Sequence, residues 1–222
     1  TCSWCRRSDT SQCPFIAPIG FARDGGLAEF LCWPASHVIP LPNHVSSEEA
    51  ALVEPTSVAY HAFYKSCPQA EDTVAILGVG TIGMLAMQIA KAAGTKVFAI
   101  DLSQRKLDMA KRLGADATIN SSISDIPKTL MELTDGIGPD IVIDCAGGSN
   151  TTKLAVESVR KGGRVVLVAI YTSTPKFDFN SIVGTEISIT GSIANNITDA
   201  QNAVKMIGSG QIQTKPLVSD II

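Results

Sequence analysis

The feature that most constrains the fold is a regular alternation of short apolar segments with amphipathic ones, which starts near residue 73 and continues to about residue 207. The apolar segments have the length and composition of buried strands, and the segments between them carry apolar residues at helical spacing. We expect strands at residues 74–77, 96–100, 117–119, 140–144, 164–169 and 186–190. We expect helices at residues 82–93, 103–113, 125–133, 150–162 and 198–207. Because strands that are apolar throughout lie in sheets covered on both faces, the pattern predicts an α/β fold with a doubly wound parallel sheet.

The first part of the chain is different in character, with several prolines and no such alternation. Residues 27–32 and 38–42 are typical of extended strands joined by turns, and the prolines in this region exclude a helix interior. Ser46 or Ser47 can cap a short helix, and helical spacing resumes at residues 56–63.

Composition excludes several classes of partner. The 222 residues contain 45% hydrophobic and 18% charged residues with a net charge of -3, which indicates an ordered globular protein without a nucleic-acid or membrane partner. No apolar run approaches the ~20 residues that cross a bilayer. Three of the six cysteines lie within the first 13 residues, a distribution unlike a secreted disulfide framework. We therefore expect a cytoplasmic protein with reduced thiols. We also expect the chain to be part of a longer protein at both ends, since Thr1 stands where an initiator Met would be.

A glycine-rich segment follows the first predicted strand and opens the first predicted helix of the alternating region. Gly78 allows a tight turn, Gly80 lets the backbone approach a pyrophosphate, and Gly83 lets the helix pack closely on the strand. The amides around the helix start point toward the phosphates and add the positive end of the helix dipole. The segment fits the dinucleotide-binding pattern G-x-G-x-x-G of Rossmann domains with Gly78, Val79, Gly80, Thr81, Ile82 and Gly83.

Asp101 lies at the end of the second predicted strand, 18 residues after Gly83. This is close to the ~20-residue interval expected for the acid that binds the adenosine ribose. A carboxylate there accepts hydrogen bonds from ribose hydroxyls and repels a 2′-phosphate, so we predict NAD rather than NADP. Arg105 and Lys106 follow closely and can soften that preference. The alternative is a glycine-rich turn in an unrelated α/β protein, with Asp101 serving only as a helix-capping acid.

The cysteines at the start of the chain have the spacing of a metal site. Cys2 and Cys5 form C-x2-C, and Cys13 follows eight residues later. Thiolates at such spacing suit tetrahedral zinc, which takes four N or S ligands in structural sites. Three thiolates require a fourth ligand from before Thr1. A closed shell of this kind would hold a loop together and would not catalyse. The alternative is three unrelated loop cysteines.

Three separated features together resemble one family, the zinc-containing medium-chain dehydrogenases/reductases, along essentially the whole chain. The three N-terminal cysteines match the last three of the family's structural-zinc motif C-x2-C-x2-C-x7-C. Residues 25–30, with Pro34 and residues 38–42, look like the strand that leaves that zinc lobe. Residues 52–58 resemble the Glu-Pro segment of the polyol branch, which includes sorbitol, threonine and 2,3-butanediol dehydrogenases. Residues 78–83 and Asp101 match the coenzyme domain.

The resemblance implies roles for individual residues and a domain division. Glu54 matches the acidic residue at the catalytic zinc, and the alternative is a helix N-terminal acid satisfied by backbone amides. Val58 and Val168 match positions beside the nicotinamide, and Lys106 matches a basic residue near the adenosine. Residues 1–55 would form part of a GroES-like catalytic domain with the structural-zinc lobe, and residues 56–222 the NAD-binding Rossmann domain. Family members are commonly dimers or tetramers, so a homo-oligomer is expected of the full-length parent.

The sequence also departs from the family pattern. The family's first catalytic-zinc cysteine, its His-Glu pair and its proton relay have no match in residues 1–222, and the C-terminal segment that returns to the catalytic domain is also missing. We interpret the chain's three histidines, His37, His44 and His61, as structural. For the full-length parent we expect zinc-assisted hydride transfer from a secondary alcohol, diol or polyol to NAD. Two alternatives remain: a zinc-free quinone or enoyl reductase that uses NADPH, and a nucleotide-binding, zinc-stapled fragment without catalysis. The chain alone is expected to be inactive.

Overall fold

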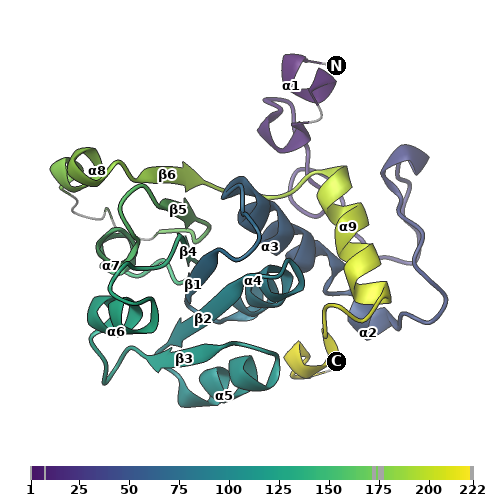
Figure 1. Ribbon diagram of the computed structural model, residues 1–222. Helices are drawn as coiled ribbons and strands as arrows, with labels where there is room; N and C mark the ends of the chain where they lie inside the picture. Colours follow the sequence, from purple (N-terminus) through teal and green to yellow (C-terminus); the bar gives the residue numbers. More distant parts are fainter. Residues whose placement is uncertain (1, 8, 172–173, 175–177, 221–222) are drawn as a thin grey trace.

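A six-stranded, all-parallel sheet forms the centre of the protein, as the computed structural model shows for residues 2–7, 9–171, 174 and 178–220 (Figure 1). The strand order is β3-β2-β1-β4-β5-β6. After β3 the chain crosses back to the other side of β1, so the strand order reverses at the boundary between β1 and β4. This order and the parallel pairing confirm the predicted doubly wound fold. The strands are β1 Thr73–Leu77, β2 Lys96–Asp101, β3 Ala117–Asn120, β4 Ile141–Asp144, β5 Arg164–Leu167 and β6 Ser188–Gly191.

Helices cover both faces of the sheet, and each face has its own hydrophobic core. Alternate residues of β1 separate the two cores, with Val74 and Ile76 in one and Ala75 and Leu77 in the other. All four are almost fully buried, which explains why the strands are apolar throughout. The first core lies under α3 Val53–Lys65, α4 Thr81–Ala92, α5 Gln104–Arg112 and α9 Ile197–Gly208, and the second under α6 Ile126–Leu133 and α7 Thr151–Ser158.

Several predicted helix boundaries agree with the structure. Ser46 caps α2 Ser47–Ala50 through a reciprocal pair of hydrogen bonds with Glu49. Two helices, α4 and α5, are followed by glycines with positive φ, Gly94 at +85° and Gly114 at +105°. Ser103 occupies the N-cap position of α5 without a side-chain capping bond.

The helix predicted at residues 150–162 is shorter than expected, and one helix was not predicted. The predicted range was wrong at its end because α7 stops at Ser158. The backbone N–H of Arg160 instead donates to the carbonyl of Pro139, which turns the chain toward β5. The additional helix, α8 Phe179–Thr185, has no buried residue, so the periodicity that reports burial is absent.

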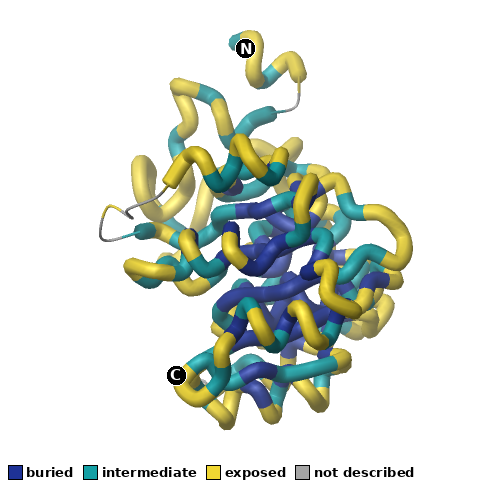
Figure 2. The backbone as a smooth tube through the Cα atoms, turned by 60° about the vertical axis from the view of Figure 1, so that its left-hand side comes forward, coloured by how far each residue is buried: buried dark blue, intermediate teal, exposed yellow. Residues whose placement is uncertain are grey.

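The strands predicted at residues 27–32 and 38–42 were wrong. Within the described residues, nothing between 24 and 46 is a strand, and the short 3-10 turn η2 Ala35–His37 lies there instead. Two other short helical elements, α1 Ser3–Arg6 and η1 Thr10–Gln12, lie earlier in the chain. Leu27 and Phe30 are fully exposed, and most of this region lies on the surface (Figure 2). A strand needs a hydrogen-bonding neighbour and a packed face, and no described segment supplies either here.

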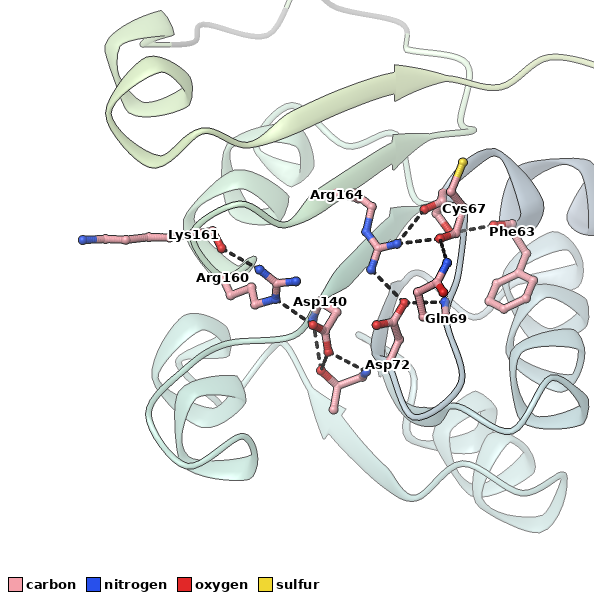
Figure 3. A network of polar contacts seen from close by, with 10 residues as sticks. Phe63, Cys67, Gln69, Asp72, Asp140, Arg160, Lys161 and Arg164 are labelled. Carbon is pink, nitrogen blue, oxygen red and sulfur yellow. Dashed lines mark hydrogen bonds and ion pairs between the residues drawn. The ribbon is translucent and has the colours of Figure 1, made fainter.

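A polar network ties the amino ends of the central strands to the loop between α3 and β1 (Figure 3). Arg164 donates to the carbonyls of Ser66 and Cys67 and to the Asp72 carboxylate at 2.6–3.0 Å. Nearby, Asp140 accepts from the Thr73 backbone at 2.8 Å and from Arg160 Nε at 2.6 Å. This edge is opposite the one where the strands end.

Within the described part of the chain, no helix has the length and apolarity needed to cross a bilayer.

Candidate functional site

The glycine-rich turn lies where β1 ends, at the point where the strand order reverses. Gly78 has φ +84°, which a side chain rarely permits. A Cβ at Gly83 would lie 1.9 Å from the Gly78 carbonyl oxygen, so α4 approaches the turn as closely as glycine allows. A Cβ at Gly80 would meet nothing within 4 Å. The geometry therefore gives the three glycines three different tasks: a turn, a close contact, and open space in front of the helix.

Asp101 is held rigidly at the end of β2, facing this turn. Its Oδ2 accepts the Val79 N–H at 3.0 Å and its Oδ1 accepts the Ser103 N–H at 2.9 Å. Lys106 Nζ lies 3.7 Å from Oδ2. A carboxylate oxygen has two lone pairs, so each oxygen can accept one more hydrogen bond. The carboxylate is thus already oriented for hydroxyl groups of a ligand.

A cleft of about 430 Å³ opens beside Asp101 along the carboxyl ends of β1, β2 and β4. Its walls combine apolar side chains, the glycine turn and a few polar groups, as expected of a nucleotide site. The lining residues are Leu77, Gly78, Gly80, Ile100, Asp101, Leu102, Lys106, Ser121, Cys145, Ala146, Thr151 and Leu154.

A second cleft of similar volume lies at the amino end of α4. The N–H groups of the first turn of a helix have no intrahelical partner and carry the positive end of its dipole. Thr81 lies in that turn, and Arg105 and Lys106 of α5 line the same cleft. Residues 216–219 also line it. Backbone amides and two cations make this a position that favours a phosphate group.

The remaining predicted site residues lie on separate elements. Val58 is half-buried on α3, and Val168 follows β5 with its N–H donating to the Asp144 carbonyl at 3.0 Å. Ile82 is in the first turn of α4. Glu54 is exposed in the first turn of α3, and no group of three or more potential ligands in the described residues includes it.

The three N-terminal cysteines converge. Cys2 Sγ lies 3.6 Å from Cys5 Sγ and 3.8 Å from Cys13 Sγ. In a tetrahedral site with Zn–S bonds of ~2.3 Å, sulfurs are separated by about 3.8 Å, so the thiols fit three corners of such a site. Cys2 occupies the N-cap position of α1 and Cys5 lies within the helix, which explains how C-x2-C spacing brings their side chains together. A hydrogen bond from the Cys5 backbone is the largest of the effects that lower the pKa of Cys2 to about 7, which favours the thiolate that binds metals.

Two of the three histidines make long-range contacts that suit a structural role. His61 Nδ1 lies 2.8 Å from Asp199 Oδ2 between α3 and α9, and His44 Nε2 lies 2.8 Å from the Gly208 carbonyl.

Sequence reasoning missed one buried polar centre beside the cleft. Asp144, the last residue of β4, is fully buried and accepts hydrogen bonds from Thr151 and Tyr171. Its neighbour Cys145 lines the cleft, and burial raises the pKa of that thiol to about 12. The available signal was an acid ending an otherwise apolar strand at the ligand-binding edge of the sheet.

The comparisons with known proteins agree with this geometry. A family model described as zinc-binding dehydrogenase matches residues 81–209, more than half of the chain. A sorbitol dehydrogenase of Halalkalibacterium halodurans is 32% identical over 221 residues, which are 98% of this chain and 64% of that protein. The chain therefore spans less than two thirds of this relative's length.

Solved structures similar to this chain include two with a bound nicotinamide cofactor. A zinc-binding dehydrogenase from Sinorhizobium meliloti 1021, bound to NADP, is 29% identical with a TM-score of 0.89, over 96% of this chain and 63% of that one. A short chain alcohol dehydrogenase from Escherichia coli CFT073, complexed with NADH, is 28% identical with a TM-score of 0.89, over the same shares of the two chains. With its fold, its cleft and the matched family model, the chain belongs to the zinc-binding dehydrogenase family.

Proposed function

We propose that this chain is the nicotinamide-dinucleotide-binding part, with a zinc-bound lobe, of a dehydrogenase that oxidises a secondary alcohol, diol or polyol. The observation that carries the proposal is the pairing of open space at Gly80 with the anchored carboxylate of Asp101 across one cleft. Residues 1–55 then belong to a GroES-like catalytic domain and residues 56–222 to the dinucleotide-binding domain. α3 begins at Val53, so its first turn crosses that division.

The residues of this chain bind and orient the cofactor, which supplies the hydride acceptor when bound. Asp101 accepts hydrogen bonds from the adenosine ribose. The amides around Thr81 and Ile82 bind the phosphates, Lys106 lies near the adenosine, and Val79 belongs to the glycine turn. Val58 and Val168 border the nicotinamide. These assignments follow the family resemblance and are supported by the positions of the residues around the two clefts.

We propose NAD rather than NADP as the cofactor. In the proposed binding mode a 2′-phosphate would approach the carboxylate of Asp101, both of whose oxygens accept backbone N–H groups. Moving it aside would break those bonds. Arg105 and Lys106 line the second cleft and can reduce the repulsion, and Lys106 Nζ lies 3.7 Å from Asp101 Oδ2. The preference is therefore for NAD, with weaker binding of NADP.

Two zinc roles are proposed. Cys2, Cys5 and Cys13 provide three thiolates of a structural site, which their separations of 3.6 and 3.8 Å support. Glu54 provides a carboxylate toward a catalytic zinc, whose other ligands in the family have no match in residues 1–222. We therefore expect the 222-residue chain to bind NADH without oxidising sorbitol. Turnover by this chain alone would contradict that expectation.

The cofactor proposal is tested by titrating the chain with NADH and NADPH and following nicotinamide fluorescence. Wild type is expected to bind NADH at least about tenfold more tightly than NADPH, as the loss of charge-assisted hydrogen bonds predicts. Asp101→Asn should remove most of that difference. Asp108→Asn on α5 is the matched control, because Asp108 is exposed and accepts a hydrogen bond from Gln104 on the same helix. A wild-type chain that binds neither nucleotide would refute the proposal.

The zinc-free NADPH-dependent reductase is the alternative within the same superfamily. The converging cysteines and the Asp101 carboxylate favour the zinc and NAD proposal over it.

Reduced thiols fit a cytoplasmic location, and we propose a homo-oligomer for the full-length protein. Light scattering after size-exclusion chromatography would measure that state.

A further inference from the structure

Asp144 is a charged residue in the most buried layer of the protein. Its side chain is 0% exposed at the end of β4. Four donors surround the carboxylate: the backbone N–H groups of Ala146 and Gly147 on Oδ1, at 3.0 and 3.2 Å, and the hydroxyls of Thr151 and Tyr171 on Oδ2, at 2.6 and 2.7 Å. A buried carboxylate is tolerated when its acceptor positions are filled in this way. Asp144 is therefore a fully satisfied buried acceptor.

The donors come from two different segments of the chain. Ala146, Gly147 and Thr151 belong to the turn after β4 and the start of α7, whereas Tyr171 follows β5. The Asp144 backbone carbonyl also accepts from the N–H groups of Val168 and Ala169, at 3.0 and 3.2 Å. The two segments touch, because a Cβ at Gly147 would lie 2.8 Å from Ala169 Cβ. Asp144 thus connects the turn after β4 with residues 168–171.

Both segments lie at the ligand edge of the sheet. The turn after β4 faces the glycine turn so closely that a Cβ at Gly78 would lie 2.8 Å from Ala146 Cβ. Ala146 and Thr151 line the cleft beside Asp101. In doubly wound folds the dinucleotide crosses this crevice, with one mononucleotide on each half of the sheet. The segment after β5 belongs to the β4–β6 half, on the other side of the crevice from Asp101.

We propose that Asp144 and Tyr171 form a positioning pair that holds residues 168–171 in place for the nicotinamide half of the cofactor. This inference rests on the proposed dinucleotide binding. Tyr171 supplies the one side-chain tie among the described contacts between that segment and the carboxylate. Without the hydroxyl, Asp144 keeps three donors, so the turn after β4 stays fixed while residues 168–171 lose their side-chain anchor. The adenosine half of the site depends on the turn, and the nicotinamide half depends on the anchor.

The test compares two ligands that share the adenosine half. NADH and ADP-ribose are titrated by calorimetry against wild type, Tyr171→Phe and Tyr60→Phe. Tyr171→Phe should raise the Kd of NADH about five- to tenfold, which is within the range for losing one ordinary hydrogen bond, and leave the Kd of ADP-ribose unchanged. Tyr60→Phe is the matched control, because its hydroxyl contacts Asn202 between α3 and α9 rather than the cleft. It should leave both ligands at their wild-type affinity.

Asp144→Asn provides a second, different signature. The side-chain NH2 group of asparagine is a donor and would face two of the four donors that now bond to the carboxylate. Both segments should therefore loosen, and both ligands should bind more weakly. Thermal melting of each variant measures folding separately from binding. Equal weakening of NADH and ADP-ribose by Tyr171→Phe, or no effect on either, would overturn the positioning role. If wild type binds ADP-ribose and NADH equally well, the segment does not serve the nicotinamide half. If wild type binds neither ligand, the proposed function itself fails.

Discussion

Gly83→Ala tests how α4 packs on the sheet, because Gly83 lies against the backbone of Gly78 with no room for a side chain. The added Cβ would start 1.9 Å from the Gly78 carbonyl oxygen, and real Cβ contacts essentially never fall under 3.0 Å. Its other near neighbours are the Gly78 carbonyl carbon at 3.0 Å and Ile76 Cγ2 at 3.3 Å. Because the nearest atoms are backbone, no side chain can rotate away. The whole amino end of α4 must move off β1.

That movement affects a helix whose residues from 83 to 90 are all buried. Overpacking a core costs about 1–3 kcal/mol and sometimes more, and a rigid backbone contact belongs at the upper end. Alanine gains up to ~1 kcal/mol over glycine within a helix, which offsets part of this cost. We expect the free energy of unfolding to fall by about 2–3 kcal/mol. For a domain of this size that corresponds to a Tm lower by about 5–10 °C.

Gly80→Ala is the matched control, because its Cβ would meet nothing within 4 Å and its φ of -69° suits any residue. It should melt at the wild-type temperature while weakening NADH binding, since the new methyl group projects where the backbone must approach the phosphates. Differential scanning calorimetry and NADH titration of both variants separate the two effects. A Gly83→Ala protein that melts at the wild-type temperature would refute the docking argument.

The other predictions concern the remaining polar centres. Cys13→Ser should reduce the zinc that copurifies with the chain, as measured by plasma mass spectrometry; unchanged zinc would exclude the thiol cluster as the site. Burial raises the pKa of Asp140, but hydrogen bonds from Thr73 and Arg160 outweigh it and hold that pKa below its usual value. The ionised Asp140 therefore stabilises the folded protein above the unfolded pKa of ~3.9, and this stabilisation is lost as pH falls through the folded pKa. The free energy of unfolding of wild type should exceed that of Asp140→Asn by about 1–3 kcal/mol at neutral pH, and the difference should shrink in acid. A difference independent of pH would contradict this. Arg164→Met should destabilise by a similar amount without changing NADH affinity, because Arg164 lies at the opposite edge of the sheet from the cleft.

The elements that the sequence predicted well are those whose burial leaves a local signal. The strands of the sheet are apolar because both faces are covered, and helices such as α4 and α5 carry apolar residues at helical spacing. The glycine turn was recognisable because its glycines have a fixed spacing, and because Gly78 and Gly83 meet backbone requirements that other residues rarely meet. Asp101 was recognisable by its distance along the chain from that turn. These features depend on residues near one another in sequence.

Features that depend on distant segments were not predicted from the sequence. Residues 27–32 have the composition of a strand, but in the described structure they have no neighbour to pair with and remain exposed. Asp144 was assigned only to the end of a strand, because its importance comes from Tyr171, 27 residues away. The sequence alone determined the class of fold, the dinucleotide turn and the cysteine spacing, since these follow from local geometry. Tertiary structure decided which segments border the cleft and which buried acid joins them, because those contacts arise only when strands far apart in sequence end at the same edge of the sheet.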